Sequence, residues 1–178
     1  MLVSEGESFQ RKLLQIQCFL QFATDLEKLA RVLLMTDHDQ AGVESYEVEL
    51  IGESGLKTTG LFQAIDDTEH RCRLILDCSL GRFTAVESDY FECLARIREQ
   101  LEPLGVTPLC YGASRRVFPS GMARDMGYGL KAYKLELRRH GRTADLVEIF
   151  DSGPDIEPAT VREQEEFYQQ WLSSLKSS

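Results

Sequence analysis

The residues best suited to bind a ligand lie in an arginine-rich stretch between positions 115 and 131. A Pro-Ser-Gly run interrupts it, and Ser120 in that run is a typical helix N-cap, so we predict a short helix over 120–127. The free amides at the start of such a helix and the surrounding guanidinium groups both favour phosphate or carboxylate. We therefore predict a set of residues that binds an anion or a partner. Its members are Arg115, Arg116, Ser120, Arg124 and Lys131.

The charge pattern supports a second interpretation of the same residues. The net charge is −9, yet residues 110–144 hold eight basic side chains against two acidic ones. The segments on either side are acidic, with 15 acidic and six basic residues over 37–109 and eight against two over 145–178. The arginines could therefore pair with carboxylates of their own chain, and this alternative stays open beside ligand binding. A nucleic acid partner is not expected, because the negative total repels phosphates.

Motifs for catalysis, cofactor binding or metal binding receive little support. Gly127, Gly129 and Ala132 fit a G-x-G-x-x-A pattern, but it leads into a strand-like run instead of the helix that a dinucleotide site requires. The three histidines lack ligand spacing. Cys110 ends an apolar run, which is typical of a packed thiol, and no G-x-S-x-G elbow supplies a nucleophilic serine. We expect no catalytic residue, no metal and no cofactor, and we favour a binding protein over an enzyme.

Composition favours a protein of the reducing cytoplasm. Five cysteines are scattered without a C-x-x-C pair, so neither a disulfide framework nor a zinc site is expected. The longest apolar runs, such as 32–35, are far shorter than the roughly 20 residues that a bilayer requires. The acidic start of the sequence is unlike a secretory signal. We therefore predict a cytoplasmic location and no membrane partner.

The hydropathy pattern predicts an α+β fold. Apolar residues at spacings of three and four indicate helices over 8–34, over 88–101 and from Thr160, where Glu163 completes a capping box. Alternation of apolar and polar residues indicates the strands. They cover 46–50, 57–65, 72–76, 106–111, 131–137 and 146–150, with a basic hairpin tip over 138–142. We expect one mainly antiparallel sheet, opening with a three-stranded meander and packed against an N-terminal, a middle and a C-terminal helix.

Two segments are expected along the chain. Residues 1–36 form a helical segment, and residues 37–178 form a single α+β domain. The apolar stripe of the first segment either packs on the domain or joins two copies of the chain. A homodimer through the N-terminal helix is therefore a further expectation.

Several short runs in the second half of the chain carry a resemblance to a known group. They are 101–105 (LEPLG), 119–122 (PSGM), 126–127 (MG), 130–133 (LKAY) and 146–151 (LVEIFD), extended in the last helix by Gln164, Phe167, Tyr168, Trp171 and Leu172. In these runs the chain resembles uncharacterised bacterial proteins associated with Rhs-type and other polymorphic-toxin loci, which are candidate immunity proteins. The resemblance covers about residues 101–175. It implies a cytoplasmic protein that binds and masks a cognate toxin domain.

Two functional hypotheses remain. The first is a binding protein, in the form of an immunity protein that neutralises a toxin by direct contact. An acidic protein gains electrostatic complementarity toward a basic toxin domain. The alternative is an enzyme or sensor that binds a small anionic ligand through the arginine-rich segment 114–131.

Overall fold

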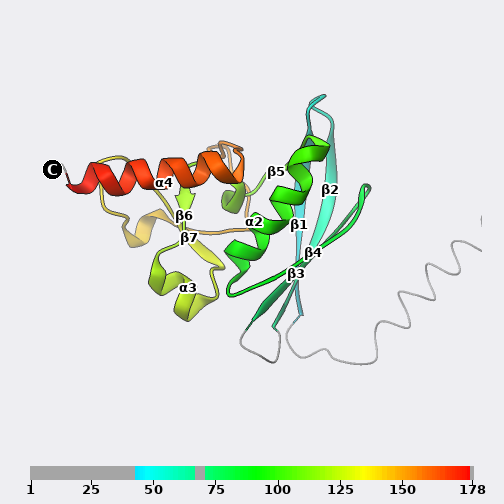
Figure 1. Cartoon of the computed structure of the whole chain (residues 1–178), viewed down its shortest axis with the longest axis horizontal. Coiled ribbons are helices and arrows are strands. Elements are labelled where there is room, and N and C mark those ends of the chain that lie inside the picture. The colour runs from blue at the N-terminus through cyan, green and yellow to red at the C-terminus, as the bar shows by residue number, and fades with distance from the viewer. Residues whose placement is uncertain (1–42, 67–70, 177–178) are drawn as a thin grey trace, which may run out of the picture. The chain divides into compact units, whose positions relative to one another are not determined.

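A five-stranded antiparallel sheet forms one layer of the domain (Figure 1). The computed structural model describes residues 43–66 and 71–176. The helix predicted over 8–34, the boundary after residue 36 and the homodimer through that helix lie outside the described residues. The strands are β1 (Val43–Gly52), β2 (Lys57–Asp66), β3 (Cys72–Cys78), β4 (Gly81–Glu87) and β5 (Val106–Pro108), in spatial order β4-β3-β2-β1-β5. The three predicted meander strands are confirmed, and a fourth follows them.

Strand β4 is absent from the sequence prediction. It returns along β3 through a two-residue loop, with Cys78 opposite Gly81, whose φ of 127° suits glycine. Ala85 is the one fully buried residue of the strand, while Phe83 and Val86 are only half-buried. Because so few of its side chains reach the core, β4 gives a weak period-two signal.

Helix α2 (Tyr90–Leu101) covers one face of this sheet and packs against β3 and β4. Alternate strand residues point toward it, as period-two geometry requires. Phe62 of β2 and Leu74 of β3 are completely buried and belong to one cluster with Leu94 and Ile97 of α2. Each such burial contributes about 1.5–3 kcal/mol, so this cluster is the main source of cohesion in the fold.

The ends of α2 are set by side-chain chemistry. The helix predicted over 88–101 would start at Ser88, but the observed cap is Asp89, whose carboxylate accepts the backbone N–H of Glu92 at 2.8 Å. A carboxylate is a stronger acceptor than a hydroxyl, and Asp89 also forms an ion pair with Arg124. The predicted stop is confirmed, since a 3-10 turn η1 (Glu102–Leu104) leads to Gly105 in the left-handed conformation, with a φ of 65°.

A second, three-stranded antiparallel sheet corrects the prediction of a single sheet. Its strands are β6 (Val117–Phe118), β7 (Lys131–Lys134) and β8 (Leu146–Glu148), in that order. Helix α3 (Gly121–Gly127) connects β6 to β7, and helix α4 (Val161–Lys176) packs against β6 and α2. In the view of Figure 1, β6 and β7 lie between α3 and α4. The α+β class is confirmed, but the C-terminal helix packs beside this smaller sheet.

Three predicted strands are longer than the observed ones. The strand predicted over 106–111 ends at Pro108, and a close approach follows it, since a Cβ on Gly112 would lie 2.5 Å from Leu94. That approach is made by a 3-10 turn, η2 (Tyr111–Ala113). The strand predicted over 146–150 ends at Glu148, since Ile149 and Phe150 turn into the main core. The strand predicted over 131–137 ends at Lys134, where the chain leaves for the hairpin tip.

Helix α4 is anchored through a buried polar contact with α2. Arg98 and Gln164 are each only 2% exposed, and the guanidinium of Arg98 donates to the side-chain oxygen of Gln164. At the start of the helix, Glu163 and Thr160 form the predicted capping box, with Thr160 N donating to Glu163 Oε2 at 2.8 Å. Among the described helices, none is both long and apolar enough to span a membrane.

Candidate functional site

The predicted binding residues are distributed among separate partners. Arg116 forms an ion pair with Glu157 at 2.7 Å, and Lys131 forms one with Glu148 at 3.0 Å. Ser120 accepts a backbone N–H of α3 at 3.2 Å, which confirms the short helix and its cap. The side chains are thus engaged within the chain and are not gathered around one anion.

Arg124 has the most enclosed environment of this set. Its guanidinium lies 2.9 Å from the carboxylate of Asp89, whose side chain is 3% exposed. The same group lies over the rings of Phe91 and Phe118, at 5.3 and 5.5 Å from their centroids. Arg124 therefore ties α3 to the start of α2, because a buried carboxylate needs a paired charge.

Internal pairing accounts for most of the basic segment 110–144. Five of its eight basic side chains form ion pairs with carboxylates of this chain, and these are Arg116, Arg124, Lys131, Lys134 and Arg139. Arg115 lies over the ring of Phe167 at 5.7 Å. The side chains of Arg138 and Arg142 have no ion pair among the described residues. Among the described residues, three basic side chains of the segment therefore lack an ion pair, and two of them, Arg138 and Arg142, lie at residues 138–142, which we call the tip.

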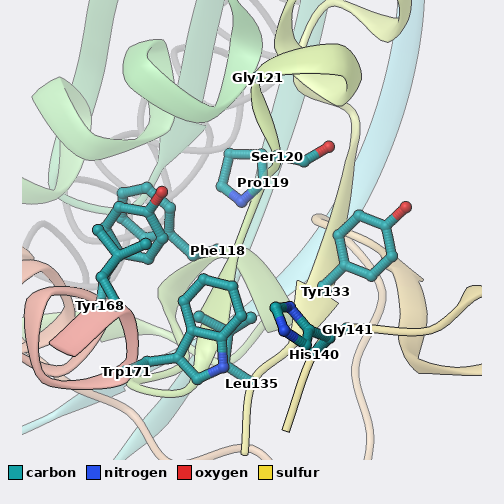
Figure 2. A pocket seen from close by; sticks show the side chains of 11 residues that line it. Phe118, Pro119, Ser120, Gly121, Tyr133, Leu135, His140, Gly141, Tyr168 and Trp171 are labelled. Atoms are coloured by element: carbon teal, nitrogen blue, oxygen red, sulfur yellow. The ribbon is translucent and has the colours of Figure 1, made fainter. Parts of the chain in front are cut away.

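The tip forms one wall of a pocket of about 400 Å³ (Figure 2). We call this the aromatic pocket, because its walls come mainly from rings. They are Phe118 of β6, Tyr133 of β7, Tyr168 and Trp171 of α4, and His140 of the tip, with Pro119 beside them. Phe118 and Tyr168 stack at a centroid distance of 3.9 Å with an interplanar angle of 8°. Apolar rings with a few polar groups are the usual lining of a ligand pocket.

Hydrogen bonds hold the walls of the aromatic pocket together. The indole N–H of Trp171 donates to the backbone carbonyl of Arg139 at 2.9 Å, and the backbone N–H of Arg138 donates to Ser174 Oγ at 2.8 Å. These two bonds connect the tip to α4. Gly141 lies against Tyr133, where an added Cβ would be 3.1 Å from the ring. These contacts fix the walls of the pocket relative to one another.

A second hollow, of about 490 Å³, adjoins the aromatic pocket and shares Ser120 and Tyr133 with it. It lies along α3, where Met122 and Met126 are 72% and 80% exposed and Tyr128 is 46% exposed. We call these three residues the methionine patch. The patch and the aromatic pocket meet at Ser120 and Tyr133, which line both hollows.

Neither a metal cluster nor a thiolate at Cys110 is found in the part of the chain that the structure describes. They contain no group of three His, Cys, Asp or Glu side chains placed to hold a metal ion. Cys110 is completely buried, and burial raises the pKa of its thiol to about 11. The thiol is protonated at neutral pH, as expected of a packed cysteine.

Sequence reasoning does not identify the aromatic pocket. The sequence places Tyr168 and Trp171 in the helix that begins at Thr160 and His140 in the hairpin tip, but it does not bring them together. No local sequence signal groups these rings, because Phe118, Tyr133 and Trp171 are far apart in the chain; in the structure all three are only partly buried. No periodicity places these rings around one hollow, because they come from three different elements.

Comparison of the chain with protein-family models and with curated proteins finds no match.

Proposed function

We propose that this chain is a cytoplasmic binding protein that contacts a protein partner through the methionine patch and the aromatic pocket. The observation that carries the proposal is the exposure of Met122 and Met126 beside an aromatic hollow. Large contiguous apolar surfaces are uncommon on proteins that have no partner. Methionine side chains are flexible and polarizable, so they adapt to the surface of a partner.

The surroundings of the patch resemble the anatomy of a protein interface. An ion pair between Lys131 and Glu148 borders the second hollow, and Asp125 is exposed on the same helix as the two methionines. An apolar centre within a polar rim is the usual arrangement at interfaces, because the rim keeps water away from the central contacts.

The partner that we propose is a toxin domain, with the chain acting as its immunity protein. The support is the resemblance of residues 101–175 to candidate immunity proteins and the net charge of −9. A strongly acidic protein attracts a basic domain over several ångströms and accelerates encounter. Neutralisation by contact needs no catalytic residue on this chain.

Co-expression with the toxin encoded next to this chain's gene tests the proposal. We expect growth to be rescued and the two proteins to copurify. Met126→Glu should weaken the complex at least about tenfold, because it places a charge in the apolar centre. Leu56→Glu is the matched control, since Leu56 is 68% exposed but lies in the turn between β1 and β2. The affinity of the Leu56→Glu variant for the toxin should stay within about twofold of the parent value.

Two results would contradict the proposal. One is the absence of both rescue and copurification. The other is a pair of results in which Met126→Glu leaves the complex intact and Leu56→Glu weakens it. That pair would indicate an interface on the five-stranded sheet.

The alternative function, binding of a small anion by segment 114–131, has less support from the geometry. Arg116, Arg124 and Lys131 are each neutralised by a carboxylate of the same chain. An added anion would have to displace Glu157, Asp89 or Glu148. We therefore favour protein binding.

A further inference from the structure

We propose that the aromatic pocket receives an aromatic side chain of the partner that has an acidic residue beside it. This inference rests on the proposed function, because it assumes a protein partner. It adds the chemistry of the anchoring residue, which neither the methionine patch nor the net charge specifies.

The shape and lining of the pocket favour a ring. Its volume of about 400 Å³ falls in the range of small ligand sites, and rings of three elements face it (Figure 2). Tyr133 and Trp171 stand on different walls of the hollow, from β7 and α4. An inserted ring can therefore make stacked or edge-to-face contacts with more than one neighbour.

The indole of Trp171 is fixed and presents only apolar surface to an occupant. Its single N–H is already used by the carbonyl of Arg139, at 2.9 Å. The ring packs at 5.8 Å from the ring of Tyr168, which itself stacks on Phe118. Pre-arranged aromatic walls lower the ordering cost of binding and favour a rigid, flat occupant over a flexible chain.

The charge around the pocket favours an acidic neighbour for that ring. None of the eleven described residues that line it is Asp or Glu. Gly141 is a lining residue and Arg142 follows it in the chain, whereas Arg138 lines a separate hollow along α4; neither arginine has an ion pair among the described residues. The two carboxylates near the tip, Glu136 and Asp145, both form ion pairs with Arg139, and Asp145 also accepts the backbone N–H of Arg142 at 2.9 Å.

A cationic occupant fits this environment less well. Aromatic rings do attract cations, but a buried cation also needs a nearby carboxylate or a site free of like charge. The tip offers basic groups instead. The occupant that satisfies both the rings and the unpaired arginines is an aromatic residue flanked by Glu or Asp.

The single tryptophan of the chain makes the inference directly testable. Trp171 is the only tryptophan, so the full chain labelled with nitrogen gives one indole N–H signal in an NMR spectrum. We would titrate the chain with three blocked peptides, acetyl-EFE-amide, acetyl-KFK-amide and acetyl-EAE-amide. A single anchoring side chain gives millimolar affinity, so the titration must reach about 10 mM.

We expect acetyl-EFE-amide to shift the indole signal and to saturate. Acetyl-KFK-amide should bind at least about fivefold more weakly, and acetyl-EAE-amide should leave the signal in place. The double variant Arg138→Glu with Arg142→Glu should remove the preference for the acidic peptide. Arg162→Glu is a single charge reversal on an 85% exposed side chain of α4 that pairs with Glu166, and it should preserve the preference.

Three outcomes would overturn the inference: no indole shift with acetyl-EFE-amide, equal or tighter binding of acetyl-KFK-amide, or binding of free phenylpropionate while the peptide is excluded. The last would make the pocket a small-molecule site. Failure of this inference is distinguishable from failure of the proposed function. If Met126→Glu weakens the toxin complex while no peptide binds, the proposed interface is supported and the proposed aromatic anchor is rejected.

Discussion

Arg98 is a buried cation without a carboxylate partner in the described structure. Its guanidinium donates to the carbonyls of Gly112 and Ala159, at 3.1 and 2.7 Å, and to the side chain of Gln164. Burial lowers the pKa of Arg98 to about 10, which still leaves it charged at neutral pH. Three neutral oxygens thus replace the water that the charge has lost, so each of them matters for stability.

Gln164→Leu should lower the free energy of unfolding by about 2–4 kcal/mol. The amide of Gln164 also donates to the carbonyls of Ser114 and Val117, both at 2.8 Å, and leucine would leave these oxygens and Arg98 short of partners. Urea denaturation measures the loss. Gln170→Leu, at an exposed position of the same helix, should stay within about 0.5 kcal/mol. Equal effects of the two variants would show that the buried network does not anchor α4.

At the scale of elements, the turn from α3 into β7 depends on two glycines with different roles. Gly129 has a φ of 69°, and a Cβ there would lie 2.7 Å from Asp89 Oδ1. Gly127 ends α3 without a positive φ and has open space around it. The pattern that resembles a dinucleotide fingerprint is therefore a helix-to-strand turn that packs against the cap of α2.

Gly129→Ala should destabilise the fold by about 2 kcal/mol or more, since it combines a left-handed conformation with a clash against Asp89. The melting temperature should fall by roughly 4–8 °C for a domain of this size. Gly127→Ala should change stability by less than about 1 kcal/mol, in the stabilising direction, because alanine favours the helix. Thermal unfolding of both variants measures the difference. A loss of the same size for Gly127→Ala would contradict the close approach at Gly129.

The elements that the sequence predicts are those whose own residues determine them. Ser120 caps α3 and Thr160 with Glu163 caps α4 through contacts within three residues, so local patterns are enough to find them. Strand β4 is not predicted because its own apolar alternation is weak. Its position depends on pairing with β3 and on the turn between the two strands. The cap of α2 is Asp89 and not the first residue of the predicted range 88–101, and its pairing with the distant Arg124 is a contact that no local pattern shows.

The candidate site is less predictable than the fold for the same reason. The sequence does locate the basic segment and a short helix within it, and internal pairing was one of its two interpretations. Which charges are neutralised depends on long-range pairs such as Arg116 with Glu157 and Lys134 with Asp155. The hollow between β6, β7 and α4 exists only after these elements have packed, so sequence spacing could not reveal it.

At the scale of the whole molecule, long-range and short-range electrostatic interactions affect partner binding in separate ways. The net charge of −9 acts over distances comparable to the Debye length and governs encounter with a charged partner. The unpaired arginines of the tip act only at contact. A basic partner can therefore be attracted by the molecule as a whole and still present an acidic residue to the tip.

This separation predicts how the proposed toxin complex responds to salt. Raising NaCl from about 50 to about 500 mM screens the long-range attraction, so the association rate should fall at least about tenfold. The dissociation rate should change less than about threefold, because the apolar contacts of the methionine patch are not screened. Surface plasmon resonance measures both rates. Met126→Glu should mainly raise the dissociation rate and should leave the salt dependence of the association rate nearly unchanged. A salt-independent association rate for the parent protein would mean that its acidity has no part in finding the partner.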